Sequence, residues 1–194
     1  MSAALRLSGL GCVRGGRALF TGIDLGLGPG DAVAVTGPNG AGKTSLLRVV
    51  AGLLPAQAGT VESEGRLAMA GEQAALDPER PLAKALHYWA RIDGGGEAEV
   101  ATALEAMGIA HLADVPVRML STGQRKRAVL ARILAGGADI WLLDEPANGL
   151  DTASRERLEA AIAAHRAAGG IAMVATHQPV AMPGAVELPI GSAA

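Results

Sequence analysis

The feature that most constrains this chain is a glycine-rich loop placed between an apolar strand and a helix. Residues 37–44 read Gly-Pro-Asn-Gly-Ala-Gly-Lys-Thr and match the pattern G-x-x-x-x-G-K-[ST] in full. The apolar run 32–36 predicts a buried strand before the loop, and 43–50 predicts a helix after it. Glycines allow the backbone N–H groups to point at phosphate oxygens, and the helix adds the positive end of its dipole. The pattern therefore predicts a nucleotide site on an α/β fold.

The loop and the first turn of the helix supply the side chains expected to hold the phosphates. Lys43 offers a positive charge to the β- and γ-phosphates, and Thr44 offers a hydroxyl to Mg²⁺. The residues expected to bind the nucleotide here are Gly37, Pro38, Asn39, Gly40, Ala41, Gly42, Lys43, Thr44 and Ser45.

Two carboxylates follow a second apolar run. Residues 140–143 predict a buried strand, and Asp144 and Glu145 come directly after it. Ligands of open α/β sheets bind at the carboxyl ends of the strands, so Asp144 can reach the Mg²⁺ that Thr44 holds. Glu145 can polarise an attacking water. Two acids after a strand are more often a solvated loop, but next to a phosphate loop they predict a hydrolytic site.

Composition excludes several other classes of protein. The 194 residues are 49% hydrophobic and 19% charged, which is typical of one globular domain. A net charge of −2 argues against a broad basic face, so we expect no nucleic-acid partner. The single cysteine, Cys12, excludes a disulfide framework and a multi-cysteine zinc site. The sequence contains no run of 18 or more uncharged apolar residues, so we expect no segment that spans a membrane.

The remaining pattern alternates strands with helices, which predicts a mostly parallel sheet with helices on its faces. An antiparallel strand region is expected at the N-terminus, and a helical lobe is expected to be inserted into the α/β core. Strands are predicted near 5–10, at 18–27 and at 171–175, and helices at 82–92, 97–107, 121–134 and 153–168. The whole chain, 1–194, is read as one domain, with a nucleotide-binding core of 1–72 and 120–194 and a lobe of 73–119.

Residues 120–124, Leu-Ser-Thr-Gly-Gln, have two interpretations. Ser121 and Gln124 fit an S-x-x-Q capping box for the next helix. The segment also resembles the LSGGQ signature of ABC-transporter ATPases, with Thr122 in place of one glycine. Further motifs in family order extend this resemblance over nearly the whole chain. Gln73 is similar to the family's glutamine loop, residues 148–151 to its D-loop, and His177 to its switch histidine.

The resemblance implies an ATPase of the P-loop, ABC type, with ATP and Mg²⁺ as cofactors. In that family two copies pair head to tail, so Ser121, Thr122, Gly123 and Gln124 of one copy would face the nucleotide of the other. The resemblance makes Glu145 the general base, His177 a γ-phosphate sensor and Gln73 a ligand of Mg²⁺ and water. Asp151 would link the two sites across the homodimer.

One position departs from the family pattern. The loop before the second strand usually carries an aromatic residue that stacks on adenine, but residues 13–17 contain none. Arg14 falls nearest that place, and a guanidinium can stack on a base. A solvent-exposed arginine with no such role is the alternative, so the choice between adenine and guanine stays open.

A narrower resemblance is to the ATP-binding subunits of cytochrome c maturation, or haem exporter, systems. Residues 37–48, 51–53, 114–118 and 176–178 carry it, and the chain stops soon after His177, as that branch does. It implies integral-membrane permease subunits and a peripheral position at the cytoplasmic face of the bacterial inner membrane. ATP hydrolysis would drive haem export or release of a haem-loaded chaperone. An ATPase for another small substrate is the alternative.

The chain itself offers little for haem or for a membrane surface. Its four histidines are scattered and Cys12 has no cysteine partner, so no direct haem site is expected. Tyr88 and Trp89 are half of all the aromatic residues. They either anchor a permease contact or fill the core of the helical lobe.

Overall fold

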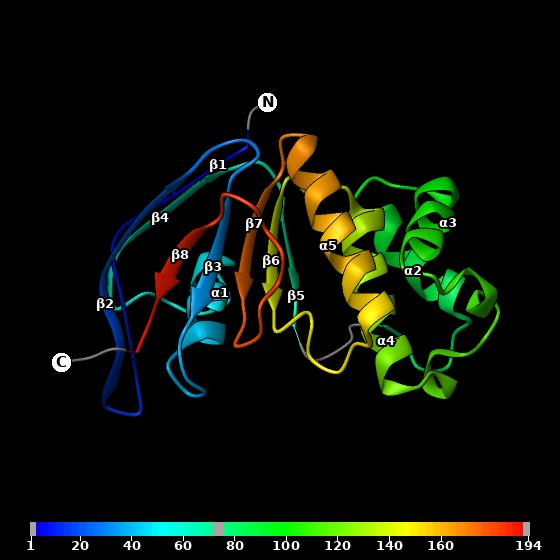
Figure 1. The fold of residues 1–194 in the computed structure, drawn as a ribbon, viewed down its shortest axis with the longest axis horizontal. Coiled ribbons are helices and arrows are strands. Elements are labelled where there is room, and N and C mark those ends of the chain that lie inside the picture. The colour runs from blue at the N-terminus through cyan, green and yellow to red at the C-terminus, as the bar shows by residue number, and fades with distance from the viewer. Residues whose placement is uncertain (1–2, 72–75, 192–194) are drawn as a thin grey trace.

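The computed structural model describes residues 3–71 and 76–191, and two sheets organise them (Figure 1). The first is a three-stranded antiparallel sheet in the order β2-β1-β4, made of β1 (Ala4–Arg14), β2 (Arg17–Leu27) and β4 (Ala58–Glu64). It confirms the expected antiparallel region. Strand β4 was not predicted, because six of its seven residues are exposed and show no apolar alternation.

The second sheet is fully parallel, as predicted. Its order is β5-β6-β7-β3-β8, and its strands are β3 (Ala32–Thr36), β5 (Leu67–Ala70), β6 (Ile140–Asp144), β7 (Ile171–Ala175) and β8 (Val186–Pro189). Every residue of β6 and β7 is buried, which explains why both read as continuous apolar runs. The carboxyl ends of β3, β6 and β7 meet at one edge of this sheet.

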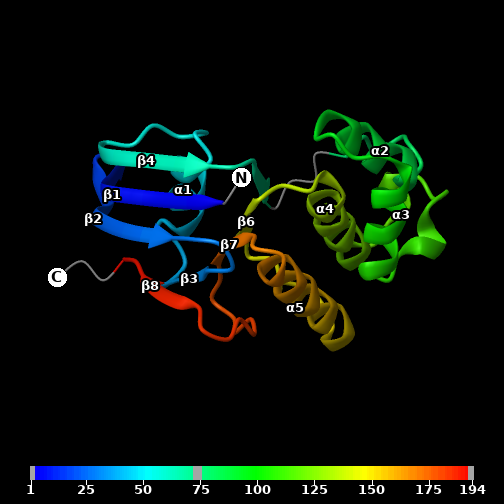
Figure 2. The same ribbon diagram turned by 90° about the horizontal axis from the view of Figure 1, so that it is seen from above.

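Helices cover the sheets in two groups. Helix α1 (Lys43–Val50) lies between the two sheets, and its leucines pack with apolar residues of both. Helices α2 (Leu82–Ile92), α3 (Glu97–Ala106) and α4 (Thr122–Gly136) form one group beside the parallel sheet, in which α4 contacts β5. Helix α5 (Thr152–Ala167) lies next to α4 and packs on β7 (Figure 2). Short 3₁₀ turns at Ala110–Leu112 and Val117–Met119 lead into α4. Within the described residues, no helix combines the length and apolar character that a bilayer crossing needs.

The predicted bounds of the helical lobe stay a prediction. In the structure, one further helix packs against the helices of that lobe. Helix α4, which the sequence analysis placed in the nucleotide-binding core, packs closely on α2 and α3. Two arginines then join this helical group to strand β5. Arg66 donates to the carbonyls of Asp93 and Gly137, at the ends of α2 and α4. In return, Arg132 on α4 donates to the carbonyl of Met69 at 2.7 Å.

Arg132 also decides between the two interpretations of the aromatic pair. Its guanidinium carbon lies 5.1 Å from the centroid of the Trp89 ring, and Trp89 is half-buried against the lobe core. Burial lowers the pKa of Arg132 from its usual value, since the charge loses hydration there. Tyr88 is 55% exposed. Trp89 is therefore a packing residue of the lobe, whereas Tyr88 stays accessible to a partner.

Away from the nucleotide loop, Trp141 on β6 stacks against His165 on α5. Their ring centroids are 3.9 Å apart and the planes differ by 8°. The His165 Nε2 atom lies 3.2 Å from the carbonyl oxygen of Ile171. Burial lowers the pKa of His165 below its ordinary value of 6.5, and outweighs the opposite effects of that hydrogen bond and of Asp139.

This lowered pKa predicts an acid-sensitive contribution to stability. The unfolded chain protonates His165 at higher pH than the folded chain does, so the contribution of His165 to the free energy of unfolding is highest above about pH 6.5. It falls as the pH drops from there to the lower pKa of the folded chain. His165→Phe keeps a ring on Trp141 but cannot titrate, so we expect its melting temperature to fall less between pH 7.5 and pH 5 than that of the wild type. For a chain of this size, a change of 1 kcal/mol in the free energy of unfolding shifts the melting temperature by roughly 2–4 °C. Calorimetry of both proteins at both pH values measures the difference. Equal pH dependence in the two proteins would contradict it.

Candidate nucleotide site

The glycine-rich loop connects β3 to α1 at the carboxyl edge of the parallel sheet, as its pattern predicts. Gly37 has φ 141° and Gly42, the residue before the helix, has φ 107°. Both values lie where side chains with a Cβ are strained. A Cβ on Gly37 would also lie 2.3 Å from the carbonyl oxygen of Ile190. The loop therefore depends on glycine at these positions to bring its backbone close around a phosphate.

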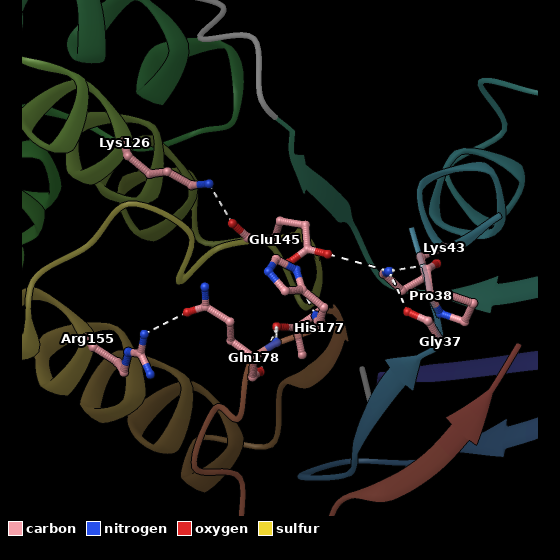
Figure 3. Close-up of polar contacts among 9 residues, drawn as sticks. Gly37, Pro38, Lys43, Lys126, Glu145, Arg155, His177 and Gln178 are labelled. Carbon is pink, nitrogen blue, oxygen red and sulfur yellow. Dashed lines mark hydrogen bonds and ion pairs between the residues drawn. The ribbon is translucent and has the colours of Figure 1, made fainter. Parts of the chain in front are cut away.

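Lys43 lies at the centre of this loop. Its ammonium donates to the carbonyl oxygens of Gly37 at 2.8 Å and Pro38 at 3.3 Å, and its side chain is 6% exposed. Its Nζ atom is 3.6 Å from Oε1 of Glu145 (Figure 3). The positive charge that the sequence analysis assigned to phosphate binding is thus held in place by the loop and faces the predicted base.

Glu145 brings two more predicted residues together. Its side chain is 15% exposed, and Oε2 lies 2.8 Å from Nδ1 of His177, which follows the end of β7 by two residues. The carboxylate therefore bridges Lys43 and His177 (Figure 3). Among the described residues, Glu145 is the one non-glycine with positive φ, at 47°. This left-handed backbone turns the chain out of β6 so that the side chain faces the loop.

Asp144 ends β6 and is 5% exposed. It lines a cavity of about 850 Å³ together with Thr44 and Glu145. Within residues 3–71 and 76–191, no three His, Cys, Asp or Glu side chains form a group that could hold a metal ion. One hydroxyl and one carboxylate are nevertheless the donors that suit Mg²⁺, which keeps waters and substrate phosphates as its other ligands. Thr44 and Asp144 fit that ion; Gln73, predicted as a further ligand, lies outside the described residues.

A second cavity of about 560 Å³ opens over the phosphate loop. Its lining includes Lys43, Thr44, Glu145 and His177. Arg14 also lines it and is exposed to solvent, and its stacking on a base stays a prediction. Asn39, Gly40, Gly42 and Ser45 contribute to the same wall. Of the residues predicted to bind the nucleotide, Gly37, Pro38 and Ala41 do not line this cavity.

The signature segment forms the capping box that its sequence predicts. Ser121 Oγ accepts from the N–H of Gln124 at 3.3 Å, and Gln124 Oε1 accepts from the N–H of Ser121 at 2.8 Å. Ser121, Thr122, Gly123 and Gln124 do not line the 560 Å³ cavity of their own chain. Ser121 and Thr122 are exposed to solvent at this N-terminal end of α4.

Asp151 is the N-cap residue of helix α5. Its Oδ1 accepts from the N–H of Ser154 at 2.7 Å, and hydrogen bonds from the Ser154 side chain and backbone lower the pKa of Asp151. The carboxylate therefore has a structural role within its own chain, and its role across a dimer stays a prediction.

Sequence reasoning missed three polar side chains around this site. Lys126 on α4 donates to the carbonyl oxygen of Glu145 at 2.5 Å. Arg155 on α5 donates to Oε1 of Gln178 at 2.7 Å (Figure 3). The Thr176 hydroxyl donates to the carbonyl of Gln178 and accepts from its N–H. A single lysine or arginine on a helix carries no motif, so only the tertiary structure identifies these contacts.

Comparison with known proteins assigns the family. Residues 20–148 match the ABC transporter family. The chain is 53% identical over 191 residues to the cytochrome c biogenesis ATP-binding export protein CcmA of Sphingopyxis alaskensis, with 98% of both chains covered. It is 51% identical over 173 residues to the protein of the same name from Novosphingobium aromaticivorans, covering 89% of this chain and 88% of that one. The chain belongs to the ABC transporter family. Within that family it groups with these ATP-binding export proteins.

Solved structures agree with this fold. An ATP-binding ABC transporter protein from Pyrococcus furiosus superposes with a TM-score of 0.85 over 96% of this chain and 97% of that one, at 22% identity. A metal-chelate-type ABC transporter in an inward-facing conformation superposes with a TM-score of 0.78 over 92% of this chain and 75% of that one, at 25% identity. The P-loop ABC ATPase fold expected from the sequence is therefore confirmed.

Proposed function

We propose that this chain is the ATP-hydrolysing subunit of an ABC transporter that acts in cytochrome c maturation. One observation of the structure carries the ATPase part: Glu145 is held between Lys43 and His177 at the mouth of the phosphate loop. The cytochrome c part is supported by the names of relatives that match the chain over nearly its full length. ATP hydrolysis would drive haem export or the release of a haem-loaded chaperone.

The residues divide the hydrolytic step among themselves. Lys43 exchanges its contact with Glu145 for the β- and γ-phosphates, which leaves the carboxylate available to a water. That water attacks the γ-phosphorus while the bond from this phosphorus to the β–γ bridging oxygen breaks, and ADP departs with that oxygen. Glu145 accepts the proton that the water loses. His177 holds the carboxylate at its other oxygen.

Mg²⁺ would neutralise charge on the β- and γ-phosphates when bound. Thr44 and Asp144 are the described residues that would hold it. Gln73 is proposed as a further ligand of the ion and of the attacking water, on the strength of the family resemblance alone.

A homodimer completes the site in this proposal. Ser121 to Gln124 of one copy would approach the γ-phosphate bound by the other, where the N-terminal N–H groups of α4 stabilise negative charge. The exposure of Ser121 and Thr122 at the start of α4 supports this arrangement. Asp151 would lie between the two nucleotide sites. ATP binding would close the pair and hydrolysis would reopen it.

Integral-membrane permease subunits are the proposed partners, and the chain would be peripheral, at the cytoplasmic face of the inner membrane. Several large apolar or aromatic side chains of the described residues are exposed, among them Leu53 at 70%, Ile92 at 60% and Tyr88 at 55%. Leu53 lines the 850 Å³ cavity between the core and the lobe together with Trp89. Such side chains are suited to an interface.

Purification from native membranes tests the proposal. A tagged Glu145→Gln chain is isolated with ATP, the co-purifying subunits are identified by mass spectrometry, and a haem absorption spectrum is recorded. We expect membrane proteins of cytochrome c maturation. Co-purification of an unrelated permease would contradict the assignment to cytochrome c maturation and would favour transport of another small substrate. A preparation with no membrane partner would overturn the transporter assignment.

A further inference from the structure

Lys126 connects the helix of the signature segment to the backbone of the proposed base. It lies in the second turn of α4, it is half-buried, and its Nζ donates to the carbonyl oxygen of Glu145 at 2.5 Å. Figure 3 shows it approaching from the side of α4, whereas Lys43 lies on the opposite side of Glu145. The two lysines therefore hold different parts of the same residue: Lys43 faces the carboxylate and Lys126 holds the main chain.

The backbone of Glu145 needs such support. Its φ of 47° is a conformation that residues with a Cβ adopt only where their surroundings fix it. The N–H of Glu145 donates to the carbonyl of Ala175 at 2.8 Å, and its carbonyl accepts from the N–H of Asn148 at 3.2 Å and from Lys126. The ammonium is the charged donor among these contacts, and a charged donor makes a stronger hydrogen bond than a neutral one, so it helps to hold this peptide group in its orientation.

The orientation of that peptide group sets where the carboxylate lies. With the left-handed backbone in place, Oε1 is 3.6 Å from Lys43 and Oε2 is 2.8 Å from His177. A return of Glu145 to an ordinary φ would rotate the side chain away from both. Misplacement of a reacting group by about 1 Å can slow a reaction by a factor on the order of 10².

We propose that Lys126 is a positioning residue for Glu145, acting through its carbonyl rather than on the nucleotide. This inference rests on the proposed role of Glu145 as general base. Helix α4 carries the signature segment at its N-terminus and Lys126 in its next turn, so a displacement of α4 reaches the base through this hydrogen bond. The bond thereby links the surface offered to a second copy with the hydrolytic residue of the same chain.

Kinetics of single variants give the first test. In single-turnover hydrolysis with the full chain in excess over ATP, we expect Lys126→Met to be about 10- to 100-fold slower, with an ATP dissociation constant within about 3-fold of the wild type. Lys126→Arg keeps a charged donor and should recover most of the rate. Arg157→Met is the matched control, because Arg157 on α5 also donates to a main-chain carbonyl, but to that of Ala106 at 3.4 Å and not to that of Glu145. It should hydrolyse ATP normally. A wild-type rate for Lys126→Met would overturn the proposal.

Amide hydrogen exchange gives a test that does not depend on turnover. The peptide covering residues 144–150 should exchange faster in Lys126→Met than in the wild type, because the N–H of Asn148 donates to the same carbonyl that Lys126 holds. Exchange elsewhere and the melting temperature report whether the variant is folded. Unchanged exchange in this peptide would show that Lys126 does not hold the turn, and would contradict the proposal.

A double variant separates this proposal from the assignment of the base. If Lys126 acts through Glu145, Lys126→Met should cause less than about 2-fold further loss in a Glu145→Gln background, measured over long incubations against protein-free ATP. A further loss as large as in the wild-type background would mean that Lys126 acts elsewhere. Wild-type hydrolysis by Glu145→Gln alone would instead overturn the proposed function of Glu145.

Discussion

Glu145→Gln is expected to hydrolyse ATP about 10²- to 10³-fold more slowly than the wild type, which is the usual loss when one polar catalytic group is removed. The amide keeps the size of the side chain but cannot accept the proton of an attacking water. ATP binding should be retained or strengthened. Lys43 lies 3.6 Å from the Glu145 carboxylate, and a neutral amide in its place leaves the ammonium more available to phosphate.

Three measurements on the same protein check this expectation. Hydrolysis is followed by phosphate release, ATP affinity by equilibrium binding, and association by size-exclusion chromatography with light scattering in ATP. The variant should accumulate as an ATP-bound dimer, because the step that reopens the pair is blocked. Glu105→Gln, which makes the same change at an exposed position of α3, should behave as the wild type. Hydrolysis by Glu145→Gln at the wild-type rate would remove Glu145 from the proposed mechanism.

The central strands and the phosphate loop could be predicted from local sequence patterns. The strands that hold the site, β3, β6 and β7, are buried in the middle of a parallel sheet, and their apolar runs are visible in the sequence without any neighbour. The phosphate loop is a contiguous segment whose geometry depends on its own glycines. Parallel topology then brings its end to the same edge as Asp144 and His177, so their juxtaposition follows from the order of strands and motifs along the chain.

Edge strands were less accessible to prediction. Strand β4 is almost entirely exposed and rich in polar residues, and β8 is a four-residue edge strand that ends in Pro189. Neither shows the alternation or the apolar run that identifies a strand, because an edge position removes most of the burial that selects apolar residues. Strand β5 has four residues, too few for a pattern.

Long-range polar contacts were not predictable for a different reason. Lys126 meets the carbonyl of Glu145, and Arg132 meets the carbonyl of Met69, but a main-chain acceptor leaves no trace in the residue type of the partner. The left-handed backbone of Glu145 is also set by tertiary contacts and not by a glycine. The sequence therefore predicts Glu145 as the base, but it does not predict the contact of Lys126 with the backbone of Glu145.

Lys43→Met should bind ATP weakly, whereas Glu145→Gln should bind ATP but hydrolyse it slowly. The Lys43 side chain is 6% exposed, and its ammonium is already held by the carbonyls of Gly37 and Pro38, so ATP meets a charge that needs little reorganisation. A hydrogen bond to a charged group contributes about 1.5–3 kcal/mol, which corresponds to roughly a 10- to 100-fold loss of ATP affinity when the group is removed. Loss of the donor also frees both carbonyls, so the loop no longer presents its N–H groups in one arrangement.

Equilibrium binding of a fluorescent ATP analogue measures the loss, and Lys84→Met is the control. Lys84 is an exposed lysine of α2, so this variant makes the same change in charge and side-chain shape away from the loop. We expect wild-type affinity for Lys84→Met, weak binding for Lys43→Met, and no ATP-dependent dimer with the latter. If Lys43→Met bound ATP as tightly as Glu145→Gln does, the buried ammonium would be a structural brace of the loop and the phosphate charge would have to be met by the backbone N–H groups alone. The two variants together therefore distinguish a lysine that binds phosphate from one that only closes the loop around it.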